Sequence, residues 1–191
     1  MLTSAAKIAQ SGPSRCPMPG SDQRISWIMP ETMENKIQMA PKMIDCIACE
    51  LSNGHRALPG GLIHRSTFWL VEHCIGPLGL GTLIVKPERH VTFVADLSEE
   101  EAAELGPLLR RTSHVACQLV EADQVYNCLW SHAGGERVHI HYVVQPVTKK
   151  QMSVFAAHGP NLQVAQFAVG ANPDLADIER VAELARMHFS D

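Results

Sequence analysis

The segment from Gln124 to Gln145 most constrains the fold, because it contains two β-strand patterns on either side of a Gly134-Gly135 pair. The two flanks, QVYNCLW and RVHIHYVVQ, are rich in β-branched and aromatic residues, which predicts strands. A glycine pair between two strands is typical of the tight turn in a β-hairpin. The segment is therefore expected to form an antiparallel pair of strands.

Strand patterns also occur at residues 66–73 and 81–86, and one long helix is predicted between them and the hairpin. The helix is expected to start at Ser98, which has the spacing of a capping box with Glu101, and to continue to about residue 122. Pro107 inside it predicts a kink or a division into two helices. Short connections between the strands predict an α+β fold with an antiparallel sheet.

Changes in pattern along the chain predict three segments. Residues 1–42 mix Pro, Gly, Ser and Met without a period, which indicates a mobile leader; the true start methionine is not fixed by the sequence. Residues 43–148 contain the strands and the long helix and form the expected main domain. Residues 149–191 are expected to be a helical extension packed on that domain, with helices at 160–170 and about 174–188.

Composition argues against several classes of function. The net charge of −4 gives no basic footprint for nucleic-acid binding, and no apolar run approaches membrane-spanning length. The first 20 residues lack the apolar stretch of a signal peptide. Six cysteines, two of them in a C-x-x-C, favour a reduced, cytoplasmic protein over a secreted disulfide framework.

Cys46 and Cys49 form the C-x-x-C, which is typical of half a zinc site or of a redox pair. A redox pair is expected to open a helix after a strand, and no strand pattern precedes Asp45. A zinc site needs two more ligands, which histidines would have to supply because the chain has no second C-x-x-C. The simple alternative is two cysteines packed in a helix or turn.

Three histidines occupy positions suited to a functional site. His90 follows the strand pattern at 81–86. His139 and His141 alternate along one predicted strand, so their rings are expected on the same face, roughly 7 Å apart. This H-x-H pair allows three interpretations: one shared metal, one ligand beside one catalytic residue, or two partly buried rings bonded to the backbone. His73, at the end of another strand, is expected to be structural.

The segment GTLIVKPERHVTFVADLSEEEAAELGPLLRR, followed about 30 residues later by VHIHYVVQP, resembles the histidine-triad (HIT) superfamily of nucleotide hydrolases and transferases. With the C-x-x-C, the resemblance covers about residues 46–146. It implies a HIT-like antiparallel sheet flanked by helices, to which this chain would add C-terminal helices. It also implies a small-molecule nucleotide as ligand and a homodimer with the 98–122 helix at its interface.

The resemblance also implies roles for individual residues. In the zinc-containing branch, which includes the galactose-1-phosphate uridylyltransferases, the metal is held by positions that match Cys46, Cys49, His90 and His139. The middle histidine of the triad is the family's nucleophile and matches His141. The implied reaction is displacement at the α-phosphate of a nucleotide through a nucleotidyl-histidine intermediate. The H-x-H pair would then be one ligand and one catalytic residue.

The chain departs from the family pattern at the third triad position, where Val143 replaces a histidine, or the glutamine of the transferase branch. Gln145, one step farther on the same face, is the expected substitute. Ser131 and Arg137 are the expected substrate contacts near the phosphate. Two alternatives to an active enzyme remain, and the departure at Val143 bears on the first of them. One is a zinc-stabilised nucleotide-binding protein with little turnover, and the other is a protein-association module formed by the residues from about 149 onward.

Overall fold

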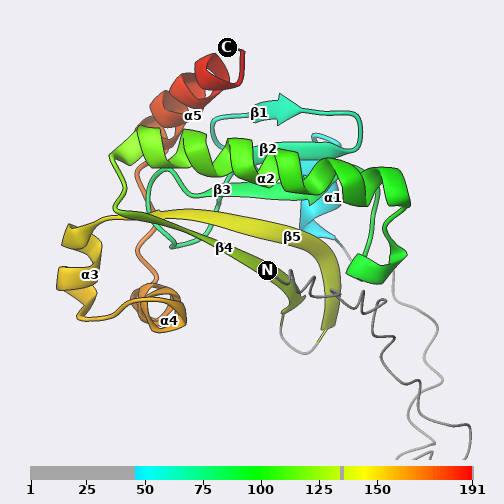
Figure 1. Cartoon of the computed structure of the whole chain (residues 1–191). Coiled ribbons are helices and arrows are strands. Elements are labelled where there is room, and N and C mark those ends of the chain that lie inside the picture. Colours follow the sequence, from blue (N-terminus) through cyan, green and yellow to red (C-terminus); the bar gives the residue numbers. More distant parts are fainter. Residues whose placement is uncertain (1–45, 134–135, 191) are drawn as a thin grey trace, which may run out of the picture. The chain divides into compact units, whose positions relative to one another are not determined.

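The computed structural model describes residues 46–133 and 136–190, which belong to one compact unit, Ile44–Asp191. None of the helices in this described part is long and apolar enough to cross a membrane. The elements, in chain order, are α1 (Ile47–Ser52), β1 (Leu62–Arg65), β2 (Trp69–His73), β3 (Leu83–Pro87), the 3₁₀ turn η2 (Val94–Asp96), α2 (Glu99–Val120), β4 (Gln124–Ala133), β5 (Glu136–Val147), α3 (Lys149–Phe155), α4 (Pro160–Val169) and α5 (Leu175–Ser190) (Figure 1).

The strands form one antiparallel sheet in the order β1-β2-β3-β5-β4, with α2 lying along one face (Figure 1). Side chains alternate between the two faces of each strand. One set packs with α2 and α5 to form the main core, and the other set faces α1 and α4. The core set contains Ile63, Trp69, Val71, Leu83, Val85 and Val144. The expected α+β fold with an antiparallel sheet and extra C-terminal helices is confirmed.

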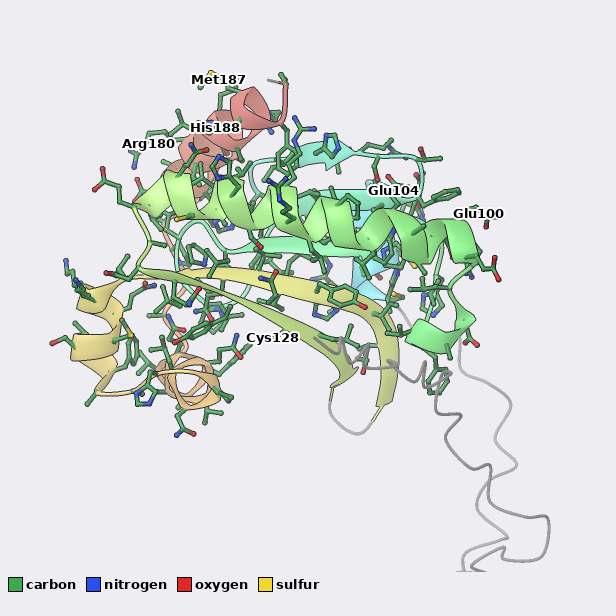
Figure 2. The ribbon with its side chains drawn as sticks, in the orientation of Figure 1. Glu100, Glu104, Cys128, Arg180, Met187 and His188 are labelled. Atoms are coloured by element: carbon green, nitrogen blue, oxygen red, sulfur yellow. The ribbon has the colours of Figure 1, made fainter. Side chains whose placement is uncertain are left out.

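Helix α2 starts as its sequence predicts. The Ser98 hydroxyl accepts a hydrogen bond from the Glu101 backbone N–H, and the Glu101 carboxylate accepts one from the Ser98 N–H. Glu100 and Glu104 lie in its first turns, where the helix dipole favours acidic groups (Figure 2). The expected division at Pro107 does not occur. Pro107 is exposed, so the carbonyl that lacks a partner N–H can be hydrated.

The last helix packs against the start of the sheet. Arg186 of α5 donates to the Gly60 carbonyl at 2.7 Å, and Arg111 of α2 donates to the Phe189 carbonyl at 2.7 Å. The loop before β1 approaches α5 so closely that a Cβ added at Gly60 would lie 2.6 Å from the Ala182 Cβ. Gly60 also has a positive φ of +74°, so this turn requires glycine for both reasons.

Candidate metal centre and adjoining cavity

The four predicted metal ligands converge at one end of the sheet. Cys46 is the N-cap residue of α1 and Cys49 lies in its first turn, while His90 follows β3 and His139 lies on β5. One donor atom from each of the four residues lies within 4.8 Å of the donor atoms of the other three. The structure therefore brings together residues that are up to 93 positions apart in the chain.

The spacing of these donors fits zinc. The Cys49 sulfur lies 3.3 Å from His90 Nδ1 and 3.5 Å from His139 Nδ1, and the Cys46 sulfur lies 3.8 Å from His139 Nδ1. Zn–S bonds of about 2.3 Å and Zn–N bonds of about 2.05 Å place tetrahedral S and N ligands about 3.6 Å apart. Two thiolates and two imidazoles also form a closed, four-ligand donor set typical of structural zinc.

His139 is oriented for ligation by its second ring nitrogen. Nε2 lies 2.9 Å from the Pro87 carbonyl, so it carries the proton and donates, which leaves the Nδ1 lone pair facing the thiols. Burial lowers the pKa of His139 to about 4, which keeps the ring neutral. Burial, followed by the neighbouring Cys46, raises the pKa of the Cys49 thiol to about 11. Metal binding therefore has to release the Cys49 proton.

The His141 ring has the opposite tautomer to that of His139. Its Nδ1 lies 3.0 Å from the His139 carbonyl and donates to it, so Nε2 is unprotonated and available as a nucleophile. Burial lowers the pKa of His141, which favours the neutral ring. One residue thus supplies two groups: the His139 ring faces the metal centre, and the His139 carbonyl fixes the tautomer of the neighbouring histidine.

A cavity of about 680 Å³ adjoins the metal centre and is lined by His139 and His141. Its floor comes from β2, β3 and β5, and α1 and α4 contribute walls. The walls are mostly apolar and include Ile47, Leu51, Ile75, Leu78, Ile84 and Phe167. A separate hollow of about 800 Å³ between α2 and α5 contains none of the predicted ligands; Arg110, Arg111, His114 and His188 line it.

No protein-family model matches the chain, and no curated protein matches it either. Solved structures do. A hypothetical histidine triad nucleotide-binding protein from Sulfolobus tokodaii superposes with a TM-score of 0.57 at 18% identity, over 76% of this chain and 92% of that one. The chain has the HIT fold. A Zn-bound histidine triad family protein from Mycobacterium smegmatis superposes with a TM-score of 0.54 at 19% identity, over 76% of this chain and 94% of that one. A Hit-like protein involved in cell-cycle regulation from Bartonella henselae superposes with a TM-score of 0.58 at 14% identity, over 75% of this chain and 96% of that one.

Two of the three predicted substrate contacts, Gln145 and Ser131, are not part of the lining of the cavity in this HIT fold. Gln145 is fully buried, and its amide donates to the Leu78 carbonyl at 2.8 Å and to Gln166 at 2.6 Å, while its oxygen accepts from Gln163 at 3.0 Å. These bonds to α4 give it a structural role, and its contact with substrate stays a prediction. Ser131 is half-buried on β4. Arg137 lies on β5, and its side chain is outside the described part of the structure.

His73, Glu72 and Lys86 also line the cavity. His73 has both ring nitrogens occupied, since Nδ1 donates to the Cys74 carbonyl at 2.8 Å and Nε2 accepts from the Gly81 N–H at 3.0 Å. Its contacts agree with the structural role expected for it. Sequence reasoning missed the other two, Glu72 and Lys86. The available signal was a single charged residue in the middle of each apolar strand, in WLVEH and LIVKP.

Proposed function

We propose that the chain is a zinc-containing HIT protein that binds a nucleotide and hydrolyses or transfers it at the α-phosphate through a nucleotidyl-His141 intermediate. The observation that carries this proposal is the arrangement of His141. Its Nδ1–H is held by the His139 carbonyl at 3.0 Å, so a neutral ring presents Nε2 to a cavity beside the four-ligand centre. A neutral, oriented imidazole is the state that nucleophilic catalysis requires.

The proposed reaction has two displacement steps. The Nε2 lone pair forms a bond to the α-phosphorus, and the bond from phosphorus to the leaving group breaks with its electrons on the leaving group. Water or a phosphate-bearing acceptor then attacks phosphorus and gives up a proton to solvent, while the N–P electrons return to Nε2. Zinc, when bound, would fix the His139 ring and thereby the backbone that orients His141.

Val143 favours a second candidate function, nucleotide binding with little turnover. The side chain is 2% exposed and packs in an apolar cluster with Cys74, Leu78 and Ile84. It offers no donor at the position where the family pattern has one. A leaving group that needs a proton or hydrogen bond there would depart slowly.

Incubation with adenosine phosphoramidate and with a diadenosine polyphosphate tests the proposal. We expect release of nucleoside monophosphate, and we expect a covalent nucleotidyl adduct by intact-protein mass spectrometry after rapid quenching. His141→Ala should abolish both signals, whereas His114→Ala on α2, outside the cavity, should keep them. Nucleotide binding without release or adduct would support the second candidate. Absence of nucleotide binding would contradict both.

A further inference from the structure

A buried ion pair forms part of the cavity floor. Lys86 of β3 donates from Nζ to Glu72 Oε1 of β2 at 2.8 Å and to the Ala48 carbonyl of α1 at 2.9 Å. The Lys86 side chain is 1% exposed and that of Glu72 is 5% exposed. Both residues line the same cavity as His141. A buried pair of charges is costly unless its remaining polar groups are satisfied.

This pair is not fully satisfied within the described residues. Glu72 Oε2 is buried and has no hydrogen-bond partner in the part of the chain that the structure describes. Lysine has three N–H donors, and the two bonds above occupy two of them. The pair therefore has one acceptor and one donor without a partner in the described residues, and both residues border the cavity. The ammonium is already neutralised by Glu72, and the unpaired carboxylate oxygen would repel an anion, so a second phosphate does not fit here.

The sheet fixes where this pair lies relative to the nucleophile. Val85 is opposite Tyr142, so Lys86 and His141 are the next positions on the neighbouring strands β3 and β5. Glu72 lies one strand farther away, on β2, where it is opposite Ile84. Two strand spacings amount to about 10 Å. A nucleotide whose phosphate meets His141 would therefore place its nucleoside end, not its phosphate, over Glu72.

We propose that Glu72, held in place by Lys86, determines base specificity by accepting a hydrogen bond from an N–H on the polar edge of the nucleotide base. The proposal rests on the proposed function, because that function places the phosphate at His141. The surrounding walls suit a base, since Ile47 and Leu51 of α1 and Leu78 of the β2–β3 loop present apolar groups to its flat faces. The polar groups of Glu72 and Lys86 would then face the edge of the base.

Calorimetric titration of the zinc-loaded protein with AMP, GMP, CMP and UMP is the first step of the test. The preferred monophosphate is then compared with an analogue in which the base N–H is replaced by C–H or N–CH₃, and with its 2′-deoxy and 3′-deoxy forms. The same ligands are titrated into Glu72→Gln, into the apolar double variant Glu72→Leu/Lys86→Met, and into Glu183→Gln. Glu183 pairs with Arg186 at an exposed position on α5 and serves as the matched control. The double variant removes both charges and keeps the test valid if Glu72→Gln destabilises the fold.

We expect wild type to bind the preferred monophosphate roughly 10- to 100-fold more tightly than the analogue that lacks the base N–H, as for a hydrogen bond to a charged acceptor. Glu72→Gln and the double variant should lose this preference, and Glu183→Gln should keep it. Retention of the preference in both cavity variants, or no preference in wild type, overturns the inference. A Glu72-dependent loss seen only with the deoxy analogues assigns the contact to the sugar and overturns the base assignment. If a nucleotidyl adduct forms but the preference for the base N–H does not depend on Glu72, only this inference is overturned. If the preference depends on Glu72 but no adduct forms, only the proposed reaction is overturned.

Discussion

Replacing His139 or His141 by alanine is expected to cause two different defects, although the residues are two positions apart on one face of β5. His139→Ala removes a predicted metal ligand, and its side chain is 1% exposed and donates to the Pro87 carbonyl at 2.9 Å. His141→Ala removes a half-buried ring that donates to the His139 carbonyl at 3.0 Å and belongs to no metal cluster in the described residues. The first change should damage the fold and the second the chemistry.

The contacts set the size of each stability effect. For His139→Ala, the unpaired Pro87 carbonyl costs about 1–3 kcal/mol, and the empty space left by a buried ring costs about 2–5 kcal/mol. For His141→Ala, one lost hydrogen bond costs about 1 kcal/mol, because the ring already borders open space. At about 2–4 °C per kcal/mol for a domain of this size, His139→Ala should lower Tm by at least about 6 °C and His141→Ala by about 2–4 °C. Loss of zinc enlarges only the first effect.

The assay measures zinc per chain by elemental analysis, Tm with and without a chelator, and nucleotide release by all variants. His141→Ala should keep one zinc and lose roughly 10⁴- to 10⁶-fold in turnover, as nucleophile deletions do. His90→Ala is the matched control, since it removes an exposed predicted ligand without leaving a hole in the core. In the presence of a chelator, His90→Ala should therefore melt like wild type. If His141→Ala loses zinc as completely as His139→Ala, both histidines bind metal and the nucleophile assignment is wrong.

Four further predictions concern the metal, the fold and the assembly. Zinc binding should release protons, because burial raises the pKa of the Cys49 thiol to about 11, and a pH-indicator titration at pH 7.5 that shows no release would contradict this. In zinc-free protein the pKa of His139 is lowered to about 4, so the unfolded chain takes up the proton at a higher pH than the folded chain does. The free energy of unfolding should therefore fall as the pH drops from about 6.5 to about 4. Urea titrations should show a weaker pH dependence for His139→Ala. Gln145→Leu should lower the free energy of unfolding by about 1–3 kcal/mol through the unpaired Gln163, Gln166 and Leu78 groups, and chemical denaturation measures it. The chain should sediment as a homodimer with α2 at the interface at micromolar concentration, and a monomer there would rule out this assembly.

The fold was predictable where local signals were strong. The capping box of Ser98, the hairpin strands β4 and β5, and the ending of α4 before Gly170 each depend on residues close in sequence, and all were expected. The elements α1, β1 and α3 were missed because they contain only 6, 4 and 7 residues. Such short segments show no periodicity, and their tertiary contacts stabilise them.

The site was predictable in its ligands and less so in its surroundings. The resemblance to the family singled out Cys46, Cys49, His90 and His139, and the structure places one donor atom of each within 4.8 Å of the others. The cavity pair was missed because the register between β2 and β3, and not any motif, brings Glu72 and Lys86 together. Gln145 was expected near the substrate because it shares the face of His141. The sequence period gives the face of a strand, but it does not show that α4 covers that end of β5.

Val143→His tests whether the missing third histidine limits turnover. The structure argues against a simple gain, because Val143 is 2% exposed between Ile84 on β3 and Cys128 on β4 and packs against Leu78. A larger imidazole there would overpack the cluster at a cost of about 1–3 kcal/mol. Its ring nitrogens would also be buried among apolar side chains that offer them no hydrogen bond. We therefore expect a lower Tm and no increase in the rate of nucleotide release. Val143→Leu enlarges the side chain without adding a donor and serves as the steric control. A rate at least tenfold above both wild type and Val143→Leu would contradict this expectation, because it would mean that the cavity can admit a third histidine that donates near the phosphate.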